Sequence, residues 1–200
     1  MTAATDDGRT RCGWADFRGE RWATDDSVLY REYHDTEWGR PLRGARELFE
    51  RMTLEAFQSG LSWLIILRKR ENFRRAFAHF DTETIARFDD RDVERLMADA
   101  GIVRNRAKIE ATIANARAAA DLDVDLGELL WSFAPEQRPR PTSMAEVPAV
   151  TPESKAMASA LKRRGFKFVG PTTAYALMQA TGMVDDHLAS CWVPTPFAGV

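Results

Sequence analysis

Two cysteines and two histidines of this chain have the side chains with which proteins most often bind zinc. Cys12 and His34 lie near the start of the sequence, and His187 and Cys191 lie four positions apart near its end. If residues 187–191 are helical, as we expect, that spacing puts an imidazole and a thiol on one face. The spacing matches no zinc finger, and a histidine beside a cysteine on a helix is more often part of an ordinary core. The residues alone leave both interpretations open.

A glutamate, Glu55, lies in a part of the sequence that is rich in aromatic side chains. These include Trp14, Trp22, Tyr30, Tyr33, Trp38, Phe49, Phe57 and Trp63. Aromatic rings beside a carboxylate suit a flat, positively charged ligand, because the rings stack on the ligand while the carboxylate accepts hydrogen bonds from the ligand's N–H groups. Glu55 adjoins an apolar helical stripe that includes Met52, which favours partial burial. Most helical glutamates are solvated, so a surface role is about as consistent with the sequence.

A third group of residues, at 160–178, combines glycines with basic side chains. The sequence predicts a helix that ends at Gly165, four linking residues, and a second helix that opens at Gly170 and Pro171. Free N–H groups at such a helix start attract an anion such as a DNA phosphate. The basic residues nearby are Lys162, Arg163, Arg164 and Lys167. An ordinary connection between two helices explains the same pattern at least as well.

Helical periodicity predicts the elements that must position these residues. Apolar residues at helical spacing begin at Ala45, and Gly60 is placed to end that helix. The other expected helices are 63–77, a short one capped by Asp81 or Thr82, one capped by Asp90 and stopped by Gly101, 105–120, and 152–165 after a proline-rich loop at 135–150. Residues 1–27 predict an irregular arm, and His79 is expected at the surface. Apart from 166–169 no run alternates with a period of two, so we expect an all-α fold.

Length, composition and charge limit the classes of protein. A chain of 200 residues with 44% hydrophobic content suits one domain or two small lobes. The net charge of −2 does not suit a protein that coats nucleic acid, so contact with DNA needs a local basic patch. No apolar run is long enough for a membrane span, and the first residues do not have the apolar core of a signal peptide. We expect a cytoplasmic protein whose cysteines are thiols or metal ligands.

Six segments of the sequence resemble one protein family, in the family's order. They are RCGW (11–14), YHDTEWG (33–39), LFERMTLEAFQSGLSWLIILRKRENFRRAF (48–77), DAGIVRNRAKI (99–109), LKRRGFKFVGPTTAYALMQATG (161–182) and DDHLASC (185–191). These strings closely resemble the DNA-3-methyladenine glycosylase I family and span most of the chain. Because no other family that we know combines them, the resemblance is highly specific.

The resemblance implies a fold and a metal. It implies a single glycosylase domain over residues 1–200, with the two-lobed, all-α helix-hairpin-helix fold and the hairpin motif at 160–182. It also implies one structural zinc ion per chain, which joins the N- and C-terminal segments. The ligands would be Cys12, His34, His187 and Cys191. Four protein ligands leave the ion no open position, so its role would be structural.

The resemblance also implies an activity, base excision repair of double-stranded DNA that contains 3-methyladenine. The enzyme would flip the damaged base out of the helix and hydrolyse its glycosidic bond, leaving an abasic site. The catalytic residue would be Glu55, which reads the base in a pocket lined or supported by Trp14, Tyr30, Tyr33, Trp38 and Trp63. The hairpin would bind DNA through Gly165, Lys167 and Gly170. We expect a monomer without lyase activity, because Pro171 and Thr172 follow Gly170 where bifunctional relatives place a lysine.

Two departures from the family pattern affect these expectations. Extra residues between Trp14 and Tyr30 make the transfer of the Trp14 role less direct. Asp185 precedes His187 much as a catalytic aspartate does in many helix-hairpin-helix glycosylases, and is a further candidate. Two other functions suit the same residues: a zinc-containing protein that recognises DNA damage without turnover, and a glycosylase for another alkylated purine.

Overall fold

The computed structural model describes residues 7–17 and 24–195, and in these residues the regular elements are all helical. The α-helices are α1 (Asp25–Thr36), α2 (Ala45–Gln58), α3 (Trp63–Ala76), α4 (Thr82–Ala86), α5 (Asp90–Ala98), α6 (Arg106–Ala120), α7 (Leu126–Trp131), α8 (Pro152–Arg163) and α9 (Pro171–Ala180). Two short 3-10 turns are η2 (Ala78–Phe80) and η3 (Met144–Glu146). The predicted all-α fold class is confirmed for the described part of the chain.

Several helix starts lie where their capping residues predict them. The Asp81 side chain accepts the Thr84 N–H at 2.8 Å and so caps α4. Thr151 caps α8, whose first residue is the proline that follows. The α5 cap is one residue earlier than expected: Asp89, rather than Asp90, accepts the first free N–H groups of that helix. Such caps satisfy backbone donors that have no partner inside the helix.

The N-terminal arm is shorter than the expected irregular segment 1–27. Residues 7–17 contain no helix, but α1 already begins at Asp25, where Thr24 accepts the Ser27 N–H. Asp25 and Asp26 in the first turn favour this start, because negative charge is stabilised at a helix N-terminus. Residues 1–6 and 18–23, and with them Trp22, lie outside the described residues.

The segment that contains His187 and Cys191 is not the last helix that the spacing predicted. Helix α9 ends at Ala180, and residues 181–195 form turns. Gly182 has a φ of +71°, and a Cβ there would lie only 2.6 Å from the backbone carbon of Arg40, so the chain leaves the helix at a closely packed glycine. The two residues still meet, because a turn from Leu188 to Cys191 brings them together.

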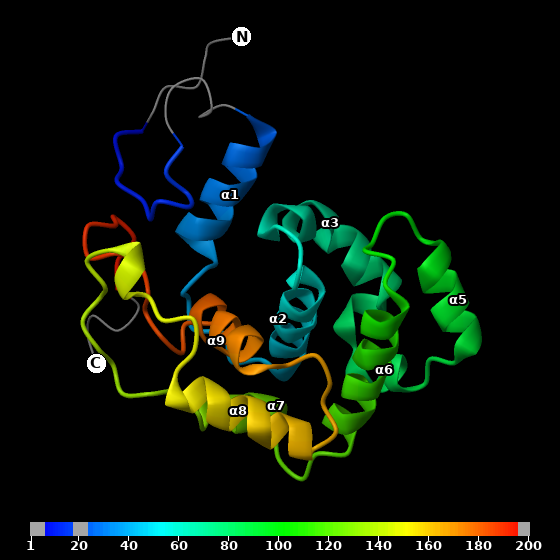
Figure 1. Cartoon of the computed structure of the whole chain (residues 1–200). Coiled ribbons are helices and arrows are strands. Elements are labelled where there is room, and N and C mark those ends of the chain that lie inside the picture. The colour runs from blue at the N-terminus through cyan, green and yellow to red at the C-terminus, as the bar shows by residue number, and fades with distance from the viewer. Residues whose placement is uncertain (1–6, 18–23, 196–200) are drawn as a thin grey trace.

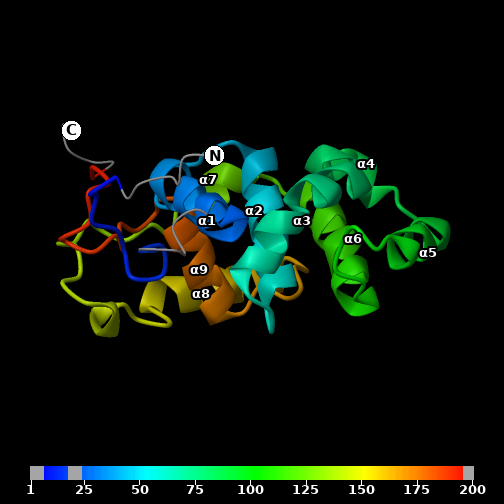
Figure 2. The same cartoon turned by 90° about the horizontal axis from the view of Figure 1, so that it is seen from above.

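The helices form two groups with α2 and α3 between them. Helices α4, α5 and α6 lie at one end, and α1, α7, α8 and α9 lie at the other (Figure 1, Figure 2). One continuous core of buried side chains extends through both groups. Along α2, every residue from Leu48 to Phe57 except Glu50 is buried, so even its polar residues are withdrawn from water.

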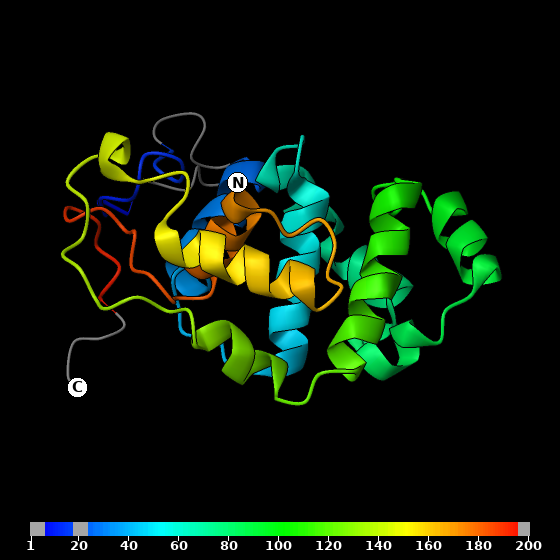
Figure 3. The same cartoon turned by 60° about the horizontal axis from the view of Figure 1, so that its bottom comes forward.

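The ends of the described chain meet at the α1 end of the molecule. The backbone N–H of Trp192 donates to the carbonyl of Thr10 at 2.9 Å. Cys12, Cys191 and Val193 form a second, small cluster of buried residues there. Helices α8 and α9 pack against each other, and the segment 164–170 joins them (Figure 3). Within the described residues, no helix is both long and apolar enough to cross a bilayer.

Candidate active site

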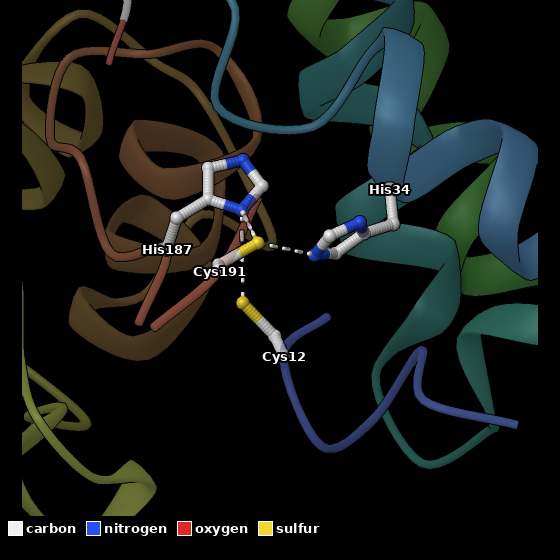
Figure 4. A group of neighbouring side chains, drawn as sticks. All are labelled: Cys12, His34, His187 and Cys191. Carbon is white, nitrogen blue, oxygen red and sulfur yellow. Dashed lines mark hydrogen bonds between the residues drawn. The ribbon is translucent and has the colours of Figure 1, made fainter. Parts of the chain in front are cut away.

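The two cysteines and two histidines of the metal prediction come together in the structure (Figure 4). Cys12 belongs to the arm, His34 to α1, and His187 and Cys191 to the turns after α9. Their ligand atoms all lie within 4.8 Å of one another, and all four residues are buried. Neither cysteine is in a disulfide. Three segments that are distant in sequence therefore converge on one Cys2His2 cluster.

The spacing within the cluster suits a tetrahedral ion. Nδ1 of His187 lies 3.6 Å from the Sγ of Cys12 and 3.6 Å from the Sγ of Cys191. Nε2 of His34 lies 3.6 Å from the Sγ of Cys191. Zinc bonds of about 2.0–2.3 Å in tetrahedral geometry separate neighbouring ligand atoms by about 3.3–3.8 Å. The donor set and these three separations therefore fit a zinc ion.

The outer nitrogen of each histidine is also engaged. Nδ1 of His34 lies 2.8 Å from Oδ1 of Asp35, and Nε2 of His187 lies 3.1 Å from the carbonyl oxygen of Trp38. Arg11 donates to both carboxylate oxygens of Asp35 and holds it in place. Because the outer N–H of each ring is donated to an acceptor, the inner nitrogen faces the cysteines with its lone pair, as metal ligation requires.

A cavity of about 320 Å³ lies next to this cluster. Two of its walls, Trp14 and Trp38, also contact the metal-site histidines: the Trp14 ring lies 5.0 Å from His34 and the Trp38 ring lies 4.7 Å from His187. The lining residues are Trp14, Tyr30, Tyr33, Trp38, Glu55, Gln58, Trp63, Met144, Val147, Ala176, Gln179 and Asp186. The cavity therefore contains Glu55 and all five aromatic residues that the sequence predicted for base binding.

The aromatic walls are locked to one another and to the helices. Trp14 makes edge contacts with Tyr30 at 5.9 Å and with Trp38 at 5.2 Å between ring centroids. The Tyr30 hydroxyl accepts the backbone N–H of Leu64 at 3.2 Å, which satisfies a free donor in the first turn of α3. The Tyr33 and Trp63 rings lie 5.4 Å apart. These contacts hold the arm, α1 and α3 together as one wall.

Glu55 is a buried carboxylate. The residue is only 7% exposed, and burial raises the pKa of its carboxyl to about 7, against a lowering influence from the Arg51 guanidinium. Among the described residues we find no hydrogen bond to the Glu55 carboxylate, so both oxygens are available to a ligand in the cavity. A carboxylate in this state attracts a cation, because the charge is poorly solvated when the cavity is empty.

Of the two adjacent aspartates that precede the proposed metal ligand His187, Asp186 belongs to the cavity. Asp186 lines it and accepts hydrogen bonds from Tyr175 at 2.6 Å, Gln179 at 2.9 Å and Arg138 at 2.6 Å. Asp185 does not line it. Its carboxylate pairs instead with the Arg140 guanidinium at 2.8 Å, in a separate cavity.

The hairpin residues Gly165, Lys167 and Gly170 are exposed, with the neighbouring basic side chains. Asn115 of α6 holds the loop, because its side chain donates to the Lys167 carbonyl at 3.0 Å and accepts the Lys167 N–H at 2.7 Å. Gly165 has a φ of +90°, which explains the glycine. Gly170 caps α9 without a side-chain hydrogen bond, so free N–H groups face solvent there. His79 is exposed, as predicted.

Comparison with known proteins decides the family. The model of the methyladenine glycosylase family matches residues 22–194. The chain belongs to the methyladenine glycosylase family. DNA-3-methyladenine glycosylase 1 of Escherichia coli strain K12 is 44% identical over 186 residues, which cover 90% of this chain and 95% of that protein. DNA-3-methyladenine glycosylase of Haemophilus influenzae is 42% identical over 188 residues, which cover 91% and 96%.

Solved structures of methyladenine glycosylases have the same fold. A crystal structure of 3-methyladenine DNA glycosylase I superposes with a TM-score of 0.84 at 44% identity, covering 92% of this chain and 98% of that one. The Staphylococcus aureus enzyme, whose structure describes 3-methyladenine recognition, gives a TM-score of 0.81 at 33% identity, covering 86% and 95%. The family resemblance and the helical glycosylase fold are both confirmed.

Sequence reasoning did not single out several residues around the cavity of this methyladenine glycosylase. Gln179 and Asp186 lie at and after the end of α9, and η3 of the proline-rich loop adds Met144. Nothing in the sequence places that loop on the cavity. Arg51 touches the back of the aromatic wall and was also missed, although its place one helical turn before Glu55 is visible in the sequence.

Proposed function

We propose that this chain is a monofunctional DNA-3-methyladenine glycosylase, acting as one domain, which excises the damaged base hydrolytically and leaves an abasic site. The observation that carries the proposal is a buried carboxylate, Glu55, without a hydrogen-bond partner among the described residues, in a cavity with aromatic walls. The volume of about 320 Å³ lies within the range of sites for small ligands. Membership of the methyladenine glycosylase family supports the choice of base.

Charge distinguishes the damaged base from normal adenine in this cavity. Methylation at N3 makes the base cationic, so the base gains from aromatic faces and from an ionised carboxylate. Trp63 and Tyr33 offer ring faces, while Glu55 accepts a hydrogen bond from the amino edge of the base. A flipped normal adenine is neutral, so its binding in the cavity offsets much less of the free-energy cost of leaving the base stack. The desolvated carboxylate strengthens this difference, because its attraction to a cation is weakly screened.

The same charge weakens the glycosidic bond. Loss of a cationic base as a neutral leaving group requires no strong general acid, so binding can provide most of the catalysis. The sugar passes through an oxocarbenium-like state that water captures. The residues that follow Gly170 offer no amine to attack the sugar, so the proposal includes no lyase step.

The hairpin is the proposed contact with double-stranded DNA. The free N–H groups before α9 can bind a phosphate, with Gly165 and Gly170 allowing close approach and Lys167 adding charge. All three residues are exposed, as this role requires. The net charge of −2 makes such a local contact necessary.

Zinc is the proposed metal of the Cys2His2 cluster, one ion per chain. Cys12, His34, His187 and Cys191 would hold it, and when bound it would supply a structural link between the arm and the turns after α9. The buried thiols suit a reducing compartment, so we place the activity in the cytoplasm. We expect the protein to act as a monomer.

Release of free base from methylated DNA tests the activity. The wild type is expected to release 3-methyladenine, detected by chromatography, and Glu55→Gln to release it at least 100-fold more slowly. Glu47→Gln is a matched control, because Glu47 lies on the same helix with its side chain half exposed. Binding of methylated DNA without release would favour a damage recogniser, and release of other alkylated purines instead would favour the third function. Strand cleavage in step with base release would contradict the absence of lyase activity.

A further inference from the structure

A buried arginine lies directly behind the aromatic wall of the cavity. The side chain of Arg51 is only 10% exposed, although its residue does not line the cavity. Its guanidinium carbon lies 5.1 Å from the centroid of the Tyr33 ring and 5.9 Å from that of Trp63. Arg51 also precedes Glu55 by four positions on α2, so the two side chains are neighbours on one helix face. A buried cation therefore adjoins three of the cavity residues.

The hydrogen bond from Arg51 fixes what the Tyr33 hydroxyl can do. Nη1 of Arg51 lies 2.7 Å from the Tyr33 oxygen. A guanidinium has donors and no acceptor, so the hydroxyl oxygen must accept this bond and keeps its own proton for another partner. Within residues 7–17 and 24–195 we find no acceptor for that proton. Tyr33 therefore offers the cavity a donor, while Glu55 offers it an acceptor.

The positive charge of Arg51 is not cancelled by its neighbours. Nη2 of Arg51 lies 3.2 Å from Glu37, but Glu37 is already bound by Arg70, which reaches its two oxygens at 2.6 and 2.9 Å. Two arginines and one glutamate leave one positive charge in excess beside Glu55. The titratable or charged groups that line the cavity with Glu55 or act on Arg51 are Tyr30, Tyr33, Glu37, Glu50, Arg70 and Asp186.

We propose that Arg51 is a positioning residue that sets the hydrogen-bond polarity of the cavity: it makes Tyr33 a donor and holds Glu55 as an ionised acceptor. Such a pair selects a base edge on which an amino donor adjoins a ring-nitrogen acceptor, as an adenine edge does. This inference rests on the proposed function, because it concerns how that cavity recognises its base. The Arg51 attraction also opposes the effect of burial, which raises the pKa of Glu55 to about 7.

Arg51→Met, which keeps an unbranched apolar stem and removes the guanidinium, removes both effects. The acidic limb of the pH profile of kcat/KM should move upward by about one pH unit, since an adjacent opposite charge lowers a carboxyl pKa by about one to three. At pH 7 that shift alone lowers the ionised fraction of Glu55 about fivefold. Arg51→Lys, which keeps the charge, should leave the limb near its wild-type position. If Arg51→Met does not fold, Arg51→Gln replaces it, with the same expected shift.

Arg70→Met is the matched control for a purely structural role. It disrupts the same ion-pair network at its other end, where the Arg70 side chain is 17% exposed, and leaves the Arg51 contact with Tyr33 intact. It should lower the melting temperature and move the acidic limb by less than Arg51→Met does, because the Arg51 charge stays beside Glu55. A limb that moves equally in Arg51→Met and Arg70→Met would overturn the proposal, as would one that moves in neither.

A double-mutant cycle tests whether Arg51 acts through Tyr33. The probe is free 3-methyladenine, with its Kd measured from tryptophan fluorescence in wild type, Arg51→Met, Tyr33→Phe and the double variant. The combined loss should be smaller than the product of the two single losses, because the part of the Arg51→Met loss that acts through the Tyr33 hydroxyl is absent once that hydroxyl has been removed; fully multiplicative losses would contradict the coupling. Carboxyl NMR of Glu55 in the free protein gives a readout that needs no substrate. If the wild type neither excises nor binds 3-methyladenine, the proposed function fails. If the titration of Glu55 is the same in Arg51→Met as in the wild type, the role of Arg51 is refuted.

Discussion

Glu55→Gln should make the protein more stable while it destroys activity, and the gain should grow with pH. Folding moves the Glu55 carboxyl from a pKa near 4.5 to one of about 7, since burial disfavours its charged form. A raised pKa in an acid means that the folded state resists ionisation, so the wild type loses stability as the pH rises above 4.5 and through 7. Glutamine carries no charge at any pH and does not incur this loss.

The magnitude follows from the two pKa values. The full difference corresponds to about 3 kcal/mol at pH 8.5, and about 1 kcal/mol of it is already present at pH 5.5. The stability difference between Glu55→Gln and wild type should therefore increase by about 2 kcal/mol over this interval. The Cys2His2 cluster is the same in both proteins, so its own pH dependence cancels in the difference.

Urea unfolding of both proteins at half-unit pH steps measures this difference directly, with equal m-values as the check on two-state behaviour. Glu47→Gln, at a half-exposed side chain on the same helix, is the control, and an equal pH-dependent gain in that variant would show that burial of Glu55 is not the cause. A flat difference for Glu55→Gln would refute the reasoning. So would one that falls with pH, since that would mean the folded state stabilises the ionised carboxylate.

Three further predictions concern other parts of the structure. Cys12→Ser should lower the zinc content, measured by atomic absorption, well below one ion per chain and should reduce the melting temperature; unchanged zinc would exclude Cys12 as a ligand. Asp186→Asn should lower kcat/KM for base release about tenfold by weakening the hydrogen bonds that hold Gln179 at the cavity, a loss of about 1.4 kcal/mol, whereas Asp185→Asn should lower it less than threefold. Equal losses would exclude a special role for Asp186. Lys108→Met removes two hydrogen bonds that Nζ donates to the carbonyls of Phe57 and Ser59 at the C-terminal end of α2, and should cost about 2 kcal/mol in urea unfolding; no loss would show that these carbonyls find other partners.

Patterns that act over a few residues predicted the helices well. Asp81 and Thr151 mark helix starts by chemistry that depends on the next three residues. The start of α1 was missed although Thr24, Asp25 and Asp26 form a similar signal, because the surrounding residues have little helical apolar periodicity.

Contacts across the chain were beyond such patterns. The proline-rich loop brings Met144 to the cavity. The spacing of His187 and Cys191 suggested a helix, but a turn brings the two side chains together instead. Asp185 and Asp186 are adjacent and chemically identical, so only the tertiary structure shows which of them faces the cavity. Glu55 was a candidate because an apolar stripe flanks it on its own helix, and the family resemblance distinguished it from an ordinary solvated glutamate. Its partners come from α1, the arm and the turns after α9.

The Cys2His2 cluster also determines how late in synthesis the N-terminal arm can fold into place. Cys12 and Cys191 are 179 positions apart, so the cluster stays incomplete until nearly all of the intervening chain has been translated. At about 5–20 residues per second the ribosome needs on the order of ten seconds or more between the two cysteines. Throughout that time Cys12 and His34 are a half-site without partners. The arm, and with it the Trp14 wall of the cavity, can take its final place only as a late event in the life of the nascent chain.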